Sequence, residues 1–368
     1  MNHRANASDP IPRAVIKTKL RRGARAVGLV YSVDDRPGYV RHGANGSFRY
    51  FNPRQRPIRH TRTLLRIRRL AIPPAWTEVW INPNPRGHIQ ATGRDARGRK
   101  QYRYHPEWDA VRDVTKFDQL IAFAEALPRL RRAVAASLRR PALDRDRVTA
   151  LVVRLLETSL IRIGNEEYER QNKSFGLTTL KDRHARITRR GVRFEFLGKS
   201  GLAHRIEVRD RRLAQLVRAT QDLPGQELFQ FLDAAGRRHK LRSNDVNEYI
   251  RRHMRGDFTA KHFRTWAGTV LAALELGARR EPTTDRQARH EIKEAVKEVA
   301  QRLGNTPTIA RKSYIHPAVI TSFTHGTLPS LPAPGGWPPR QARRNLAPEE
   351  RAVLRFLKSV HAATFAAA

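Results

Sequence analysis

Residues 185–208, ARITRRGVRFEFLGKSGLAHRIEV, alternate apolar and polar side chains in period two across two turn signals. This alternation predicts roughly three short strands joined by tight turns. The second turn, GKSG, places Lys199 at the tip of a β-hairpin, where its side chain can reach into a groove. Helical patterns flank the stretch on both sides, so a small sheet is predicted inside a mainly helical domain.

The flanking segments repeat their apolar residues at helical spacing. One such segment begins at Lys116 and holds Pro128 as a kink or a break. A second, RVTALVVRLLETSLIRIG, follows Asp144 and Asp146, and either acid could cap that helix. Toward the C-terminus, helices are predicted over 243–254, 259–277, 285–303 and 348–366, with a Pro/Gly-rich linker at 326–339.

The N-terminal part has the pattern of short strands. Residues 29–51 alternate between turn signals, and a short helix is predicted from Thr61 to Leu70 before a Pro-Pro pair. Further strands are predicted at VWIN (79–82), HIQAT (88–92) and RKQYRY (99–104). The whole chain is therefore predicted to be α+β, with a basic flexible arm over 1–28, a β-rich domain over 29–112 and an α-helical domain with the three-stranded element over 113–368.

Charge is the strongest global signal. The 368 residues include 72 Lys and Arg against 34 Asp and Glu, a net charge of +38. Such a surface attracts a polyanion, which is most often nucleic acid. The alternative of an acidic membrane is not favoured, because no basic amphipathic helix, lipidation motif, signal peptide or long apolar run is present.

The residue types also limit the chemistry. The chain has no cysteine, which excludes disulfides, thiolate zinc sites and cysteine nucleophiles and fits a reducing cytoplasm. FLGKS at 196–200 has the wrong glycine spacing and the wrong following structure for a P-loop. Neither HExxH nor an acidic cluster for two metal ions is present. No cofactor is therefore expected, and a covalent reaction would need a serine or tyrosine nucleophile.

Tyr314 is the candidate nucleophile, in NTPTIARKSYIHP (305–317). Arg311 and Lys312 precede it, and nearby cations help a phenol to ionise. From this segment alone, a partly buried aromatic on a short helix is the favoured interpretation.

Three further stretches change that balance. Arg162 ends an apolar helix, Lys199 lies at the hairpin tip, and Arg264 lies near the start of another apolar helix, in KHFRTWAGT (261–269). Singly, each has a structural explanation, such as a solvated helix end. Together, two guanidiniums can bind the non-bridging oxygens of a phosphodiester and a lysine can protonate the departing 5′ oxygen.

In their order along the chain, these segments resemble the type IB DNA topoisomerases, specifically the short poxvirus-like form found in bacteria. The resemblance extends from about Ser47 to His316. An N-terminal signature lies at IPPAWTEVWINPNPRGHIQATGRDARGRKQYRYHPEW (72–108). The catalytic segments are RIGNEEYERQNKSFGLTTLKDRH (162–184), FLGKSGLAH (196–204), FTAKHFRTWAGT (258–269) and LGNTPTIARKSYIHP (303–317).

The resemblance implies a role for each candidate residue. Tyr314 becomes the nucleophile that forms a 3′-phosphotyrosyl bond, and Lys199 the general acid. Arg162 and Arg264 become the phosphate-binding arginines. Asn305 stands where viral and recombinase relatives commonly have histidine, and asparagine can donate a hydrogen bond but cannot shuttle a proton. His262 stands where an acid is expected, a departure that could alter how Arg264 is oriented.

The resemblance also implies the function. We expect relaxation of positive and negative supercoils without ATP or metal, by a cytoplasmic, nucleoid-associated monomer whose two domains clamp double-stranded DNA. In the N-terminal domain, groove contact and plain sheet surface are equally open interpretations for Gln90, Arg94, Gln101, Tyr102 and Arg103.

Two other classes of protein share parts of this pattern. A tyrosine recombinase uses the same catalytic groups, but the β-rich N-terminal domain argues against it. A catalytically silent DNA-binding protein needs the basic charge, but it does not need Tyr314 together with Arg162, Lys199 and Arg264.

Overall fold

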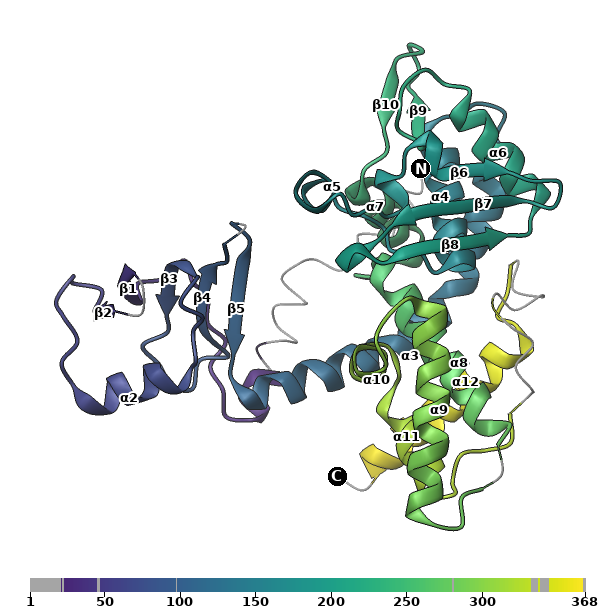
Figure 1. Ribbon diagram of the computed structural model, residues 1–368. Coiled ribbons are helices and arrows are strands. Elements are labelled where there is room, and N and C mark those ends of the chain that lie inside the picture. Colours follow the sequence, from purple (N-terminus) through teal and green to yellow (C-terminus); the bar gives the residue numbers. More distant parts are fainter. Residues whose placement is uncertain are drawn as a thin grey trace, which may run out of the picture. The chain divides into compact units, whose positions relative to one another are not determined.

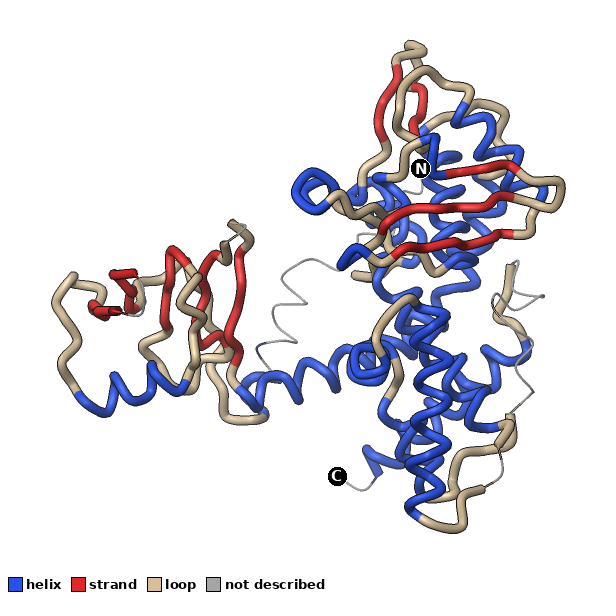
Figure 2. Tube along the Cα trace, viewed as in Figure 1, coloured by secondary structure: helices blue, strands red, loops and turns tan. Residues whose placement is uncertain are grey.

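The computed structural model describes residues 21, 23–44, 47–96, 98–279, 281–331, 337 and 344–366. Contacts divide the chain into two compact units, with the division between Asp118 and Gln119. This division falls inside the long helix α3 (Pro106–Ser137), which continues through Pro128 without a break. Strands dominate the first unit and helices the second (Figures 1 and 2).

The first unit is built on an antiparallel sheet of five strands, which confirms the predicted β-rich domain. Its core joins Ile67 of the helix α2 (Thr61–Arg69) to the inward side chains of the central strands, Val79, Ile81 and Ala91. In sheet order the strands are β2 (Ser47–Phe51), β1 (Tyr39–Ala44), β3 (Thr77–Ile81), β4 (Ile89–Arg94) and β5 (Lys100–Tyr104), which leaves β5 at one edge.

The predicted N-terminal arm lies mostly outside the described residues. Its last part is not a free arm, because Ala24 is fully buried and packs with Leu29 and Trp108. The expectation of a flexible arm over residues 1–28 is therefore corrected for the residues after position 22. Their apolar side chains belong to a second buried cluster of the first unit, which is separate from the sheet core.

The second unit contains the predicted sheet of three antiparallel strands, β6 (Ala185–Ile187), β7 (Val192–Leu197) and β8 (Ala203–Val208), in that order. A smaller hairpin pairs β9 (Gln230–Leu232) with β10 (Arg238–Lys240). The helices are α4 (Arg145–Ser159), α5 (Glu166–Asn172), α6 (Arg211–Gln221), α7 (Ser243–Met254), α8 (Ala260–Gly277), α9 (Asp285–Leu303), α10 (Pro307–Tyr314), α11 (Pro317–Thr324) and α12 (Pro348–Ala366), with short 3-10 turns at Leu177–Thr179, Asp182–His184 and Lys199–Gly201.

Helix α8 is the central helix of this unit. It is buried around most of its circumference, as expected for a helix with few polar residues. It contacts α4, α7, α9, α10, α11 and α12. Of the two acids that could cap α4, Asp144 is the cap, since its side chain accepts a hydrogen bond from the Arg147 amide at 2.9 Å.

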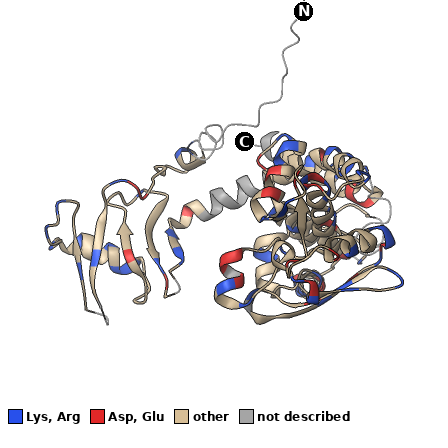
Figure 3. Ribbon diagram, turned by 90° about the horizontal axis from the view of Figure 1, so that it is seen from above, with Lys and Arg blue, Asp and Glu red and all other residues tan. Residues whose placement is uncertain are grey.

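Basic residues are spread over both units (Figure 3). Helix α2 alone carries Arg62, Arg66, Arg68 and Arg69 and no acid. The charge excess is thus a property of both units and not of one tail. Among the described residues, no helix combines the length and the apolar character that a membrane crossing requires.

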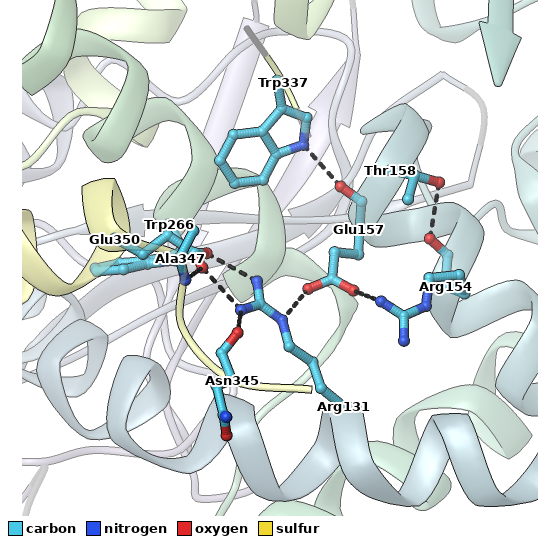
Figure 4. A network of polar contacts seen from close by, with 9 residues as sticks. All are labelled: Arg131, Arg154, Glu157, Thr158, Trp266, Trp337, Asn345, Ala347 and Glu350. Carbon is cyan, nitrogen blue, oxygen red and sulfur yellow. Dashed lines mark hydrogen bonds and ion pairs between the residues drawn. The ribbon is translucent and has the colours of Figure 1, made fainter. Parts of the chain in front are cut away.

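A charged network lies inside the second unit (Figure 4). Arg131 of α3 is 2% exposed and donates to Glu157 of α4 at 2.6 Å. It also donates to both carboxylate oxygens of Glu350 of α12, at 2.7 and 2.8 Å. Glu350 accepts a further hydrogen bond from the Trp266 indole of α8 at 2.9 Å, and the Trp337 indole donates to the backbone carbonyl of Glu157 at 2.7 Å. One guanidinium therefore connects three helices and, through Glu350, a fourth.

Replacing Glu350 by alanine is expected to destabilise this unit strongly. Arg131 would keep only one of its two carboxylate partners, and the Trp266 indole would lose its acceptor. Removing one partner of a buried ion pair costs about 3–5 kcal/mol. Urea denaturation followed by tryptophan fluorescence measures the change in the free energy of unfolding.

The matched control is Lys358→Ala, which breaks a surface ion pair between α12 and Glu125 of α3. Both partners are about half exposed, and the expected loss is below about 1 kcal/mol. Equal losses for the two variants would contradict the view that the buried network stabilises the unit.

Candidate active site

The five residues predicted to be catalytic lie together in the second unit. Arg162 follows α4, Lys199 lies in the turn between β7 and β8, and Arg264 lies on α8. Asn305 follows α9, and Tyr314 is the last residue of α10. The first four line one cavity of about 370 Å³. The guanidinium carbon of Arg264 lies over the Tyr314 ring, 5.1 Å from its centroid, which brings the phenol to the same site.

Arg264 is 5% exposed and is bound by backbone carbonyls instead of a carboxylate. Its Nη1 donates to the carbonyl of Leu160, and its Nη2 to that of Leu303 at 2.5 Å. Both carbonyls belong to the ends of helices, where intrahelical partners are missing. His262 caps α8, since its Nδ1 accepts from the Thr259 amide at 3.0 Å. The contacts that orient Arg264 thus come from the ends of α4 and α9.

The second arginine is bound to the loop after α9. Nη2 of Arg162 donates to Oδ1 of Asn305 and to the carbonyl of Gly304 at 3.4 Å. The backbone of Arg162 is bound by the SFGLTT segment, whose Leu177 amide donates to the Arg162 carbonyl at 2.9 Å. A Cβ on Gly176 would lie 2.6 Å from that carbonyl oxygen, so only glycine fits there.

Two buried donors in the site have no hydrogen-bond partner among the described residues. They are Nε of Arg264 and Nδ2 of Asn305. Buried polar groups are nearly always paired, so each unpaired donor calls for an explanation. Arg264 and Asn305, which carry these donors, line a cavity together with the cationic residues Arg162 and Lys199. An anion with several oxygens, such as a phosphodiester, would satisfy them.

Tyr314 is attached to α8 through its backbone. The Thr269 hydroxyl donates to the Tyr314 carbonyl at 3.3 Å and accepts from the His316 amide at 3.1 Å. A Cβ on Gly268 would lie 2.7 Å from the Tyr314 carbonyl oxygen, closer than real contacts allow. Sequence reasoning interpreted only Arg264 in the FRTWAGT segment. The small residues Gly268 and Thr269, which follow Arg264 in this segment, are the local signal for the close approach of α10.

The two groups that face each other affect each other's ionisation. Burial alone raises the pKa of Tyr314, but the Arg264 charge, with smaller contributions from Arg162 and Lys261, brings it below the ordinary value for tyrosine. Burial and the neighbouring Arg162 charge lower the pKa of Arg264 to about 10. Arg264 therefore stays cationic at neutral pH, and the phenol is easier to ionise than a free tyrosine.

Lys199 lies in the 3-10 turn Lys199–Gly201, which joins β7 to β8, as predicted from the sequence. Its side chain is exposed and makes no ion pair within the part of the chain that the structure describes. The turn is closed by the Gly198 amide, which donates to the Leu202 carbonyl at 2.7 Å. The ammonium is thus available to a ligand that enters the cavity.

Gln90, one of the DNA contacts considered for the N-terminal unit, is an interior residue. It is 3% exposed, its amide donates to the carbonyls of Pro85 and Gly87, and its oxygen accepts from Arg66. Gln90 lies on a strand, as predicted, but its side chain points into the loop that precedes β4 instead of toward solvent. Gln90 is therefore no longer a candidate for groove contact.

The other four candidates are more accessible. Arg94 binds Glu78 at 2.7 Å, and Gln101 donates to Asp95 at 2.9 Å. On the edge strand β5, Tyr102 is 42% exposed and stacks on Tyr104 with ring centroids 5.7 Å apart. Arg103 is exposed and donates to the Ala71 carbonyl at 2.7 Å. Exposed aromatic and cationic side chains on one strand suit a nucleic-acid contact.

Comparison with known proteins adds an independent line of evidence. The family described as eukaryotic DNA topoisomerase I, catalytic core, matches residues 101–326, and that described as bacterial DNA topoisomerase IB, N-terminal domain, matches residues 47–95. DNA topoisomerase 1B of Acanthamoeba polyphaga mimivirus is 34% identical over 262 residues, which cover 69% of this chain and 78% of that protein. DNA topoisomerase 1B of vaccinia virus (strain Copenhagen) is 22% identical over 231 residues, which cover 62% of this chain and 70% of that protein.

The unpaired donors predict that the site binds a tetrahedral oxyanion. Sulfate is expected to raise the melting temperature of the protein in a saturable way, because a ligand that binds only the folded state stabilises it. The variant Arg162→Ala should lose most of that increase. Differential scanning fluorimetry across a sulfate titration at constant ionic strength measures it.

Arg189→Ala is the matched control, since it removes the same charge from the exposed turn between β6 and β7. It should keep the sulfate response. If both variants lose the response equally, sulfate is acting on the overall positive charge and not at the site.

Proposed function

Because this chain belongs to the type IB DNA topoisomerases, which change the topology of DNA, we propose that it relaxes supercoils through a covalent bond between Tyr314 and one strand. The observation that carries the proposal is the unpaired Arg264 Nε beside the phenol, in a cavity shared with Arg162, Lys199 and Asn305. Each of these groups has a task in phosphodiester transesterification.

In the cleavage step the Tyr314 oxygen attacks the phosphorus of one strand. A tyrosyl–phosphorus bond forms to the 3′ phosphate, the bond from phosphorus to the 5′ oxygen breaks, and the phenolic proton passes to solvent. Arg162 and Arg264 bind the non-bridging oxygens and offset the charge that builds up in the transition state. The unpaired Nδ2 of Asn305 supplies one further neutral donor.

Lys199 protonates the departing 5′ oxygen in this scheme. Its place on a short, exposed turn lets the ammonium reach the leaving group. The reverse reaction closes the strand: the 5′ hydroxyl attacks the phosphotyrosyl bond and returns its proton to the lysine. The covalent bond preserves the energy of the cut phosphodiester, so religation needs no ATP.

Relaxation follows from the interval between the two steps. While one strand is cut, the free 5′ end can rotate about the intact strand, and supercoils of either sign decrease. The positive charge that a metal ion would supply comes from the chain itself, through the two arginines and Lys199. We therefore expect activity in the absence of divalent cations.

Both units contribute to DNA binding in this proposal. The first unit offers exposed side chains of the edge strand β5, Tyr102 on one face of the sheet and Arg103 on the other, and the second unit offers the catalytic cavity. All five proposed catalytic residues come from one chain, which supports action as a monomer.

The proposal is tested by relaxation of supercoiled plasmid in EDTA without ATP, with Tyr314→Phe beside the wild type. The wild type should relax the plasmid fully, and the variant should not, because phenylalanine lacks the attacking oxygen. Both proteins should bind the plasmid equally in a mobility-shift assay. Relaxation by the variant, or binding by both without relaxation by either, would refute the role of Tyr314.

The close contact between α8 and α10 gives a second prediction. In Gly268→Ala the new methyl group must displace the Tyr314 carbonyl, and misplacing a reacting group by about 1 Å can slow a reaction about 100-fold. We expect slower covalent-adduct formation with unchanged DNA affinity. The control, Gly277→Ala, makes the same change at the other end of α8, where the new methyl group would lie 3.0 Å from Cβ of Leu331 and needs only a small shift, and it should leave the rate unchanged.

A further inference from the structure

His204 lies in the catalytic cavity and has no role in the reaction described above. It is on β8, directly across from Phe196 of β7, and the two rings stack with centroids 5.1 Å apart. It lines the cavity that also holds Arg162, Lys199 and Asn305. Its side chain is half-buried, so one part of the ring faces the cavity and another is covered by protein.

The covered part of the ring lies between two glycines from separate segments. A Cβ on Gly198 would lie 2.5 Å from Cδ2 of His204, and a Cβ on Gly304 would lie 2.5 Å from its Cε1. Neither position could carry a side chain without displacing the ring. The two carbons that flank Nε2 of one imidazole therefore lie close to the β7–β8 turn and to the loop after α9.

Each glycine immediately precedes a residue of the site. Gly198 comes before Lys199, and Gly304 comes before Asn305. Gly304 is also the left-handed cap of α9, with φ at 57°, and its carbonyl accepts from Arg162. The position of the imidazole thus affects the lysine on one side and the asparagine–arginine pair on the other.

The charge around the ring favours its neutral form. Burial, together with the charges of Arg162 and Arg264, lowers the pKa of His204 below its ordinary value. Lys199 from the hairpin, Arg205 from β8 and Arg302 from α9 line the same cavity, and all add positive charge. A neutral aromatic ring can fill this place without adding a further cation.

We propose that His204 is a positioning residue, a wedge between two segments that sets the Lys199 turn at a fixed distance from the loop that carries Asn305. The inference rests on the proposed function and adds a residue to it. The ring acts through its shape and stacking and not by proton transfer. Another flat aromatic ring should therefore replace it, and a small side chain should not.

The primary test measures the rate of covalent-adduct formation under single-turnover conditions, with supercoiled plasmid and an SDS quench. His204→Ala should be slower by up to about 100-fold, the loss expected for a misplaced catalytic group. His204→Phe should stay close to the wild-type rate. If His204→Phe is as slow as His204→Ala, the imidazole takes part in proton transfer and the wedge role is wrong.

The matched control is His239→Ala. His239 lies on β10 across from Phe231 of β9, and these two rings also stack, with centroids 5.4 Å apart. The substitution thus removes the same type of cross-strand pair from a hairpin that does not line the catalytic cavity. Its adduct rate should match that of the wild type, and a loss equal to that of His204→Ala would overturn the inference.

A double-mutant cycle separates positioning from general loss of stability. If His204 acts partly through Lys199, the loss in Lys199→Ala/His204→Ala should be smaller than the product of the two single losses. Losses that multiply would overturn the proposal. Melting temperatures of all variants, measured alongside, identify any variant that is unfolded at the assay temperature.

A binding measurement keeps the test independent of catalysis. The wedge also fixes the position of the loop after α9, which binds Arg162. The increase in melting temperature caused by sulfate should therefore shrink in His204→Ala and persist in His204→Phe. If the wild type forms no adduct, the proposed function fails, and this comparison still decides the inference. An unchanged sulfate response in His204→Ala would count against the wedge.

Discussion

The structure of the second unit depends on one buried guanidinium. Arg131 lies among side chains with almost no access to water, where an unpaired cation would be very costly. Glu157 and Glu350 neutralise it, and each of these carboxylates also accepts from another group. Because a buried ion pair needs nearly complete hydrogen bonding to be tolerated, α3, α4, α8 and α12 are held to the arrangement that provides it.

The same helices also position residues of the candidate active site. Glu157 is in the last turn of α4, a few residues before Arg162, and Trp266 follows Arg264 by two positions on α8. Arg264 then connects the ends of α4 and α9 by binding the carbonyls of Leu160 and Leu303. The charged network and the arginine site thus share helices α4 and α8, so the contacts that hold these helices together also position the arginines. Because the two arginines are held in place in advance, little reorganisation would be needed for them to bind a phosphodiester, as proposed.

Many of the secondary-structure elements could be predicted from the sequence, because the spacing of apolar residues distinguishes helices from strands. The hairpin that carries Lys199, the helix that carries Arg264 and the strands of the N-terminal unit follow from local patterns of apolar residues. Contacts between distant segments could not be predicted in that way. Nothing local indicates that Thr269 binds the Tyr314 backbone, that Glu350 reaches Arg131, or that Gln90 turns inward.

The attachment of Tyr314, the proposed nucleophile, to α8 has a mechanical consequence. During strand rotation, drag on the DNA would pull on the phosphotyrosyl bond and through it on the backbone at Tyr314. Thr269 passes that force to the middle of the most buried helix, which Trp266 and Glu350 connect to the rest of the core. Under the proposed mechanism, Tyr314 would therefore serve as a mechanical anchor as well as the attacking group, and the torque of the DNA would fall on a helix packed deep in the second unit.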